Sequence, residues 1–190
     1  MLLLRTPSED AIRRFISGLA DQRFSYPEVG ASLKTPPLGY TVDHNRIELG
    51  RGAEIFERAA QALKRWEMFN LGWIHLYPPG AAPAVGTNVA VLARHLGFHS
   101  LNACRVVYVV DEDAPVKRYG FAYGTLPNHA ERGEERFSIE WRSDDSVWYD
   151  ILAFSRCNQP LAMIGYPMTR LLQKRFARDS KRAMMRAVST

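Results

Sequence analysis

One short stretch of the chain, Ala122–Phe137, gathers side chains that are suited to acid–base or metal chemistry. Its sequence, AYGTLPNHAERGEERF, holds one histidine, three glutamates and two arginines around two glycines and a proline. Imidazole and carboxylate groups are common zinc ligands and common general acids or bases. Glu134 and Glu135 are adjacent, however, and on a strand they point to opposite faces, so they are poorly placed to share one metal ion. We expect no metal site in this stretch.

The same pattern favours a hairpin loop between two strands. Glycines and a proline set the shape of turns, and charged residues keep a loop solvated. We expect the loop Gly124–Gly133 to lie at the mouth of a cavity and to act as a lid, with His129, Glu131 and Glu134 as its polar residues. Glu135, at the end of the loop, is placed to meet the polar head of a ligand.

The next hairpin sets a carboxylate among aromatic rings. A turn that is symmetric about Asp144 and Asp145 pairs Trp141 with Trp148, Ile139 with Asp150, Phe137 with Leu152 and Glu135 with Phe154. Side chains alternate between the two faces of a strand, so all these residues share one face, and it is the more apolar one. That face is expected to be the inner one.

Asp150 is therefore a candidate catalytic residue. A carboxylate in an aromatic wall must find a partner or raise its pKa. Three alternatives stay open. Asp150 pairs with an arginine or a backbone donor, or it lies at a frayed strand end. The third is a register shift by one residue, which exposes Asp150 and buries Glu140 and Tyr149.

Glu135 is the second catalytic candidate, and it lies on the same predicted face. It is separated from Asp150 by about 13 Å along the sheet, at about 3.3 Å per residue. Glycosidase carboxylate pairs are only about 5–9.5 Å apart, so a two-carboxylate mechanism is disfavoured. The expected ligand-binding set is Trp141, Trp148, Asp150, Phe137, Phe154, Tyr123 and Glu135.

The remaining histidines and cysteines do not predict a metal or cofactor site. His95 and His99 are four residues apart on a predicted strand, which separates them by about 13 Å if the strand continues. Cys104 and Cys157 have no partner at zinc-finger spacing, so two free thiols in a reducing compartment are expected. Phosphate-loop, dinucleotide and nucleophile-elbow motifs are absent from the sequence. We expect no cofactor.

Length and composition suit one globular domain over residues 1–190, with a helix and irregular connection at 1–39 and a core at 40–190. Apolar residues make up 46% of the 190 residues and charged residues 24%. The chain has no apolar run long enough for a membrane span, and its first residues are too short a run for a signal peptide. These features predict a cytoplasmic protein.

Periodicity predicts a helix, a strand, a second helix, six strands and a long last helix. The expected ranges are 6–21, 40–49, 53–66, 69–77, 87–96, 105–111, 118–125, 134–142, 147–156 and 161–188. Six consecutive strands with short links indicate an antiparallel meander. One helix covers so many strands only if the sheet curls around it. The predicted class is α+β: a curled antiparallel sheet of about seven strands that grips a long C-terminal helix, with an N-terminal helix in addition.

Several motifs identify a family resemblance. They are YPEVGAS (26–32), LGRG (49–52), NACRVVYVVDE (102–112), GFAYGTLPNHAERGEERF (120–137) and SVWYDILAFSR (146–156). The chain resembles the DUF1990 (UPF0548) family, and its element order resembles the helix-grip fold of START-like and Bet v 1-like proteins. The resemblance implies that fold but assigns no residue roles.

By analogy with that fold, we expect the protein to bind a small apolar or aromatic molecule between the sheet and the last helix. The alternative is a cyclase- or hydrolase-like enzyme that uses Asp150 or Glu135 in the same cavity. The net charge of +5 is concentrated after residue 169. There, Arg175, Arg178, Arg182 and Arg186 fall on one helical stripe, for which a solvated outer face is favoured over contact with nucleic acid or an anionic membrane. Oligomeric state is left open.

Overall fold

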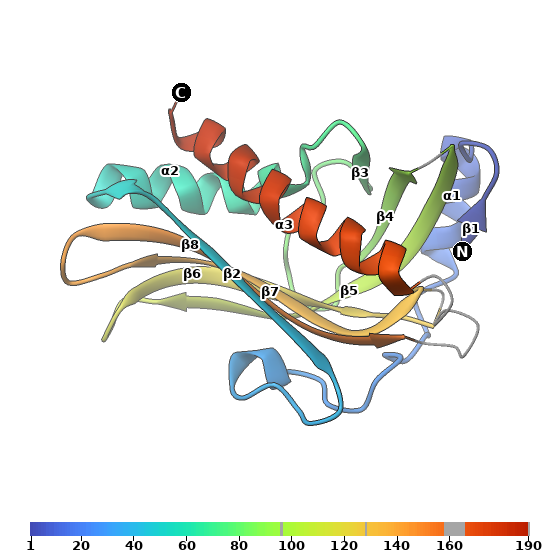
Figure 1. Ribbon diagram of the computed structural model, residues 1–190, viewed down its shortest axis with the longest axis horizontal. Helices are drawn as coiled ribbons and strands as arrows, with labels where there is room; N and C mark the ends of the chain where they lie inside the picture. Colours follow the sequence, from blue (N-terminus) through green and yellow to red (C-terminus); the bar gives the residue numbers. More distant parts are fainter. Residues whose placement is uncertain (96, 128, 158–165, 190) are drawn as a thin grey trace.

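A computed structural model describes residues 1–95, 97–127, 129–157 and 166–189 of the chain (Figure 1). A short strand β1 (Leu2–Leu3) and helix α1 (Glu9–Ser17) come first, followed by the 3-10 turn η1 (Ala31–Leu33). Strand β2 (Thr41–Arg51), helix α2 (Ala53–Lys64) and the 3-10 turn η2 (Glu67–Phe69) come next. Then follow β3 (Ile74–Tyr77), β4 (Asn88–His95), β5 (Phe98–Glu112), β6 (Lys117–Thr125), β7 (Glu131–Trp141) and β8 (Ser146–Cys157), and α3 (Tyr166–Ser189) closes the chain.

The strands form one antiparallel sheet in the order β2-β8-β7-β6-β5-β4-β3, and β1 pairs with β5. The predicted fold class is confirmed. Helices α2 and α3 lie across one face of the curved sheet, which we call the concave face (Figure 1). The segment 22–40, which includes η1, passes under the opposite, convex face. No helix in the described ranges combines the length and the apolar character that crossing a bilayer requires.

The main core lies between the concave face and the two helices. Large rings fill it because β-branched and aromatic residues alternate along the central strands. Phe121 and Phe137 are fully buried at its centre, with ring centroids 5.8 Å apart. Helix α2 contributes Phe56 and Leu63, and α3 contributes Met184. The core is dense at the α2 end of the sheet.

Helix α1 begins at Glu9, three residues later than the expected start at residue 6. Ser8 is its N-cap, and the Ser8 side chain accepts a hydrogen bond from the backbone N–H of Ala11. Thr6 instead contacts the His99 ring at 3.0 Å. The helix face with Ile12 packs on β4 and β5. The prediction of a helix was right, but both of its predicted ends lie outside the observed helix.

The register of the β7–β8 hairpin differs from the symmetric one by one residue. Asp145 adopts a left-handed conformation (φ 69°), and its N–H bonds the Arg142 carbonyl, so the loop has three residues instead of an even number. Trp141 therefore pairs with Val147, and Ser138 pairs with Asp150. The predicted facing of Trp141 with Trp148 is wrong.

This one-residue shift moves every β8 side chain to the other face. The concave face receives Tyr149 and Ile151, which are 0% and 2% exposed. Trp148, Asp150 and Phe154 lie on the convex side, although Asp150 stays buried there. The shift buries Tyr149 as the alternative register required, but it neither exposes Asp150 nor moves Glu140 to the core.

Candidate functional site

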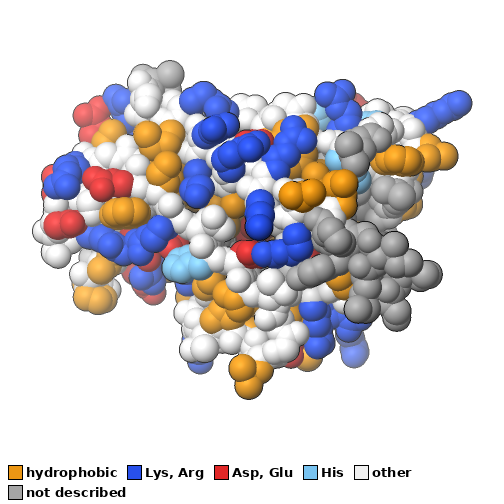
Figure 2. Space-filling view, viewed as in Figure 1, with side chains coloured by type: hydrophobic (Ala, Val, Ile, Leu, Met, Phe, Trp, Pro, Cys, Tyr) orange, Lys and Arg blue, Asp and Glu red, His pale blue; other side chains and the backbone are white. Residues whose placement is uncertain are grey.

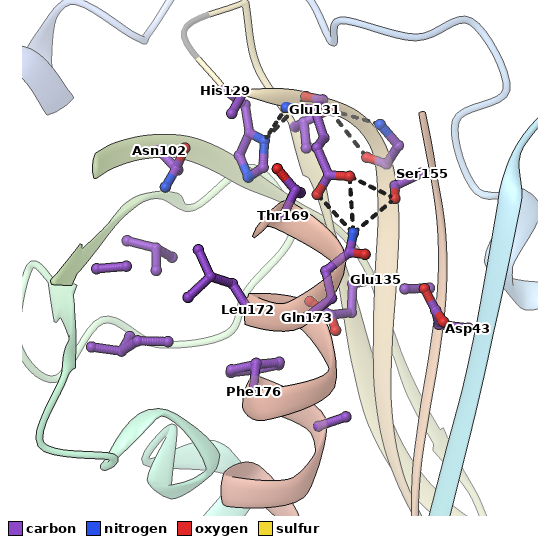
Figure 3. A pocket seen from close by; sticks show the side chains of 18 of the residues that line it. Asp43, Asn102, His129, Glu131, Glu135, Ser155, Thr169, Leu172, Gln173 and Phe176 are labelled. Carbon is purple, nitrogen blue, oxygen red and sulfur yellow. Dashed lines mark hydrogen bonds between the residues drawn. The ribbon is translucent and has the colours of Figure 1, made fainter. Parts of the chain in front are cut away.

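A cavity of about 700 Å³ lies between the concave face and the first half of α3. Phe69, Trp73, Ile74, Val91, Leu172 and Phe176 line its apolar part. Leu172 and Phe176 project into it from α3 (Figure 3). Phe176 lies 5.1 Å from the Phe69 ring, which joins the helix to the rest of the apolar wall. A volume of this size suits a small organic molecule.

The polar part of the cavity contains Glu135, whose carboxylate accepts a hydrogen bond from the Tyr123 hydroxyl at 2.7 Å. Burial raises the pKa of Glu135 to about 7, against the lowering effect of the Tyr123 hydrogen bond, and the nearby charges of Glu131 and Asp43 raise it further. The carboxyl group borders the cavity. It can therefore hold or release a proton near neutral pH where a bound molecule would lie.

A second carboxylate, Glu131, is tied to the last helix. The Gln173 side-chain amide of α3 donates to both oxygens of Glu131 at 2.9 Å, and the Ser155 hydroxyl donates at 3.1 Å (Figure 3). Burial raises the pKa of Glu131, and these hydrogen bonds oppose the rise. The three side chains join β7, β8 and α3 at one end of the cavity.

Two further groups border this polar end. The His129 Nδ1 atom accepts a hydrogen bond from the backbone N–H of Glu131 at 3.0 Å, and burial lowers the pKa of His129 to about 4, so its ring is neutral at pH 7. Asp43 on β2 forms a two-pronged ion pair with Arg170 of α3, with one contact at 2.7 Å.

Gly133 lies between Glu131 and Glu135 in the chain and has a φ of 153°. A Cβ atom at this position would collide with the Phe154 carbonyl oxygen.

The structure separates the residues that the sequence predicted as one site. Tyr123, Glu135, His129 and Glu131 border the cavity. Phe137 is buried in the core, 0% exposed, and Trp141 packs beside Phe56 of α2 with ring centroids 6.1 Å apart. Neither of these two lines the cavity.

The other predicted residues point to the convex side. The centre of the Trp148 ring lies 4.6 Å from the guanidinium group of Arg46 and 5.4 Å from that of Arg142. Phe154 is among the residues that line the cavity, but its ring packs edge-on against Tyr26 and Tyr40. The correction has the same cause in both cases, which is the register shift in β8.

Asp150 is held in an ion pair on the convex side. Its carboxylate accepts hydrogen bonds from Arg136 at 3.0 Å and contacts His44 Nε2 at 2.6 Å. Arg136 also donates to the Ser32 carbonyl oxygen. The alternative in which an arginine neutralises Asp150 is the one the structure contains. Asp150 does not line the cavity, so it is not placed to act there as a general acid or base.

Glu134 is likewise on the convex side and is not a solvated lid residue. It is 2% exposed, and it accepts hydrogen bonds from the Tyr26 hydroxyl and the Gly30 N–H, both at 2.7 Å. It also accepts from the Ser32 N–H at 3.0 Å and from the Ser32 hydroxyl. Glu134 therefore anchors the 22–40 segment to β7.

Sequence reasoning missed the contributions of α3 and η2. The last helix was expected to border the cavity, but Leu172, Gln173 and Phe176 were not predicted as binding residues. The available signal is an uncharged polar residue, Gln173, directly after Leu172 near the start of the helix. No group of three or more histidine, cysteine, aspartate or glutamate side chains able to hold a metal ion is found in the described part of the chain.

The raised pKa of Glu135 predicts a pH-dependent stability. Between about pH 4.5 and pH 7 the unfolded chain loses the Glu135 proton while the folded protein keeps it, so stability falls as pH rises. Glu135→Gln lacks this loss. Urea denaturation should show the stability of the variant relative to wild type increasing by about 1–3 kcal/mol from pH 4.5 to pH 8.

The matched control is Glu54→Gln, because the Glu54 side chain is 79% exposed. Its stability difference from wild type should be flat over the same pH range. A flat difference for Glu135→Gln as well would show that the carboxyl group titrates near its ordinary pKa.

Comparison with known proteins places the chain in a family. A UPF0548 protein of Dictyostelium discoideum is 35% identical and covers 100% of this chain and 97% of the relative. A UPF0548 protein of Deinococcus radiodurans is 38% identical, with 98% of each chain covered. Among solved structures, a hypothetical protein from Helicobacter pylori superimposes with a TM-score of 0.49 at 11% identity over 87% of this chain and 94% of that one. The model of the family described as "Domain of unknown function (DUF1990)" matches residues 25–183, and the chain belongs to that family.

Proposed function

We propose that the protein binds a small, largely apolar or aromatic molecule in the cavity between the sheet and α3. The observation that carries the proposal is the cavity itself, about 700 Å³, with aromatic side chains in its wall and the hydrogen-bonded pair Glu135 and Tyr123 among its polar groups. Apolar walls supply affinity, and a few fixed polar groups orient the ligand. The ligand we propose therefore has a flat or aliphatic body and one group that hydrogen-bonds to a carboxyl.

Filling the cavity should abolish this binding. Ala153 on β8 lines the cavity opposite Glu135 in the strand register, so Ala153→Phe places a ring where the ligand would lie. We expect the affinity for a neutral fluorescent probe, N-phenyl-1-naphthylamine, to fall at least about tenfold in an equilibrium titration.

The control adds the same ring elsewhere. Val42 on β2 is 47% exposed and pairs with Phe154 on the convex side, so Val42→Phe should keep wild-type affinity. Equal probe affinity in wild type and Ala153→Phe would contradict binding in the cavity. Native mass spectrometry of freshly purified protein adds a direct search for a co-purifying molecule, which Ala153→Phe should fail to retain.

A second candidate function is supported by one observation. Glu135, with its pKa raised to about 7, faces the cavity and is hydrogen-bonded to Tyr123. This arrangement suits proton transfer in a cyclase- or hydrolase-like reaction. Incubation of the protein with a small-molecule extract, followed by mass spectrometry, distinguishes the two. An enzyme depletes a compound in wild type but not in Glu135→Gln, whereas a binder depletes none and the variant still binds the neutral probe.

We further propose that the protein acts in a reducing compartment such as the cytoplasm. Cys104 and Cys157 are not joined in a disulfide, and burial raises the pKa of both thiols. A thiol with a raised pKa is a poor nucleophile and oxidises slowly. Two cysteines that remain thiols are therefore consistent with a reducing compartment, where disulfides are rare.

A further inference from the structure

Helix α3 presents one continuous exposed face, which we call the α3 outer face. It consists of Leu171, Lys174, Arg175, Arg178, Arg182 and Arg186, all of which are exposed. At about 100° per residue these positions fall within an arc of roughly 120° on the helix. The face begins beside Met168, which is 38% exposed. Such an arc is as wide as a face that packs on another surface.

The α3 outer face is strongly basic. Five of its six residues are lysine or arginine, and none is acidic. Figure 2 shows Lys and Arg side chains gathered over α3. The only acidic residue of the helix, Asp179, lies at the border of the face and pairs with Arg178 at 2.9 Å and Arg175 at 3.5 Å. The face therefore keeps a net charge of about +4, too large for one carboxylate to neutralise.

The end of this face nearest the cavity is apolar as well as basic. Leu171 is 61% exposed, and Met168 lies one turn before it. Exposed apolar side chains beside a basic stripe are the composition of a helix that binds at a lipid headgroup boundary. The described face carries no aromatic ring on which a nucleic-acid base could stack. The composition thus favours a lipid surface over a nucleic acid.

The α3 outer face also borders the cavity. Met168, Lys174 and Arg178 are exposed and at the same time line the cavity, so the cavity reaches the surface along this edge of the helix. We propose that the α3 outer face docks on membranes rich in anionic phospholipid, with Leu171 and Met168 at the acyl boundary and the cavity mouth turned toward the bilayer. This inference concerns a surface and does not depend on the identity of the ligand.

The test is co-sedimentation of the full-length protein with vesicles of phosphatidylcholine, alone or mixed with phosphatidylserine. Each cation near an anionic surface strengthens binding roughly fivefold, and the attraction weakens as salt screens it. We expect binding to the mixed vesicles that falls steeply with added salt, and little binding to phosphatidylcholine alone. Arg178→Glu with Arg182→Glu should weaken the binding at least about twentyfold.

Two further variants separate the apolar contribution to vesicle binding from the effect of a charge change elsewhere on the protein. Leu171→Ser removes an exposed side chain without changing charge, and it should weaken vesicle binding several-fold at every salt concentration. Arg13→Glu on α1, at a side chain that is 77% exposed, changes the net charge by two units, half the change in the double variant, at a site away from the face, and it should bind within about twofold of wild type. Circular dichroism spectra and thermal midpoints of all variants are compared first.

Three outcomes would overturn the proposal. They are equal binding to neutral and anionic vesicles, loss of binding in Arg13→Glu to the same extent as in the double variant, and no vesicle binding at low salt. Duplex DNA is titrated in parallel. DNA binding that is tighter than vesicle binding and is lost in the double variant would assign the α3 outer face to nucleic acid instead.

Discussion

Glu134→Ala will lower the free energy of unfolding by about 3–5 kcal/mol. The carboxylate is 2% exposed and accepts hydrogen bonds from Tyr26, Gly30 and Ser32. Tyr26 and Ser32 are themselves 3% and 0% exposed, so alanine leaves buried donors without a partner. Each such donor costs about 1–3 kcal/mol. Urea denaturation followed by circular dichroism measures the loss.

The loss should be accompanied by release of the 22–40 segment. Glu134 accepts four hydrogen bonds from this segment, whereas Arg136 of β7 donates one to it, so limited proteolysis of the variant should cut within 22–40 before the rest of the chain. Glu54→Ala is the control, because the Glu54 side chain is 79% exposed, and it should change the free energy of unfolding by less than about 0.5 kcal/mol. A loss below about 1 kcal/mol for Glu134→Ala would show that water replaces the carboxylate.

Arg136→Met will also cost about 3–5 kcal/mol, because it leaves the Asp150 carboxylate buried without its arginine. Asp150 is 3% exposed, and its remaining contact is His44, whose side chain is 51% exposed. The double variant Arg136→Met with Asp150→Leu removes both charges and should recover part of the loss, as buried pairs replaced by apolar residues commonly do.

A further variant, Asp150→Asn, tests whether Asp150 contributes to the cavity on the opposite face of the sheet. Because Asp150 and Arg136 lie on the convex side, Asp150→Asn should lower stability while the affinity of the cavity for N-phenyl-1-naphthylamine stays within about twofold. Arg13→Met is the control for loss of a cation, at a side chain that is 77% exposed. A tenfold loss of probe affinity in Asp150→Asn would mean that the two faces of the sheet are coupled.

The order and type of the elements were predictable because they depend on local periodicity. Helix α3 illustrates this, since Met168, Leu172 and Phe176 recur every four residues, as the apolar positions on one face of a helix do. Strand β5 was predicted too short, at 105–111 instead of Phe98–Glu112, because Ser100, Asn102 and Cys104 are weak strand formers that pairing with β4 holds in place.

The candidate site was harder to predict than the elements. Its composition depended on the register of one hairpin, and that register was set by the left-handed conformation of Asp145, a state open to several short polar residues. Hydrogen-bond partners that are distant in the sequence could not be predicted either. Glu134 with Tyr26 and Glu131 with Gln173 are pairs that only the folded chain brings together. Tyr123 and Glu135 were both placed in the expected ligand-binding set, and they are opposite each other in adjacent strands.

The position of β2 in the sheet bears on how the chain is made. β2 is among the first strands to leave the ribosome, but its neighbour in the sheet is β8, the last strand. Thr41 pairs with Ser155 and Arg51 pairs with Ser146, so β2 has no partner strand until β8 has been made. Pairing between such distant segments is slow, and until it happens β2 exposes an unpaired edge that other chains can join. Nascent chains should therefore depend on chaperones until β8 has been synthesised.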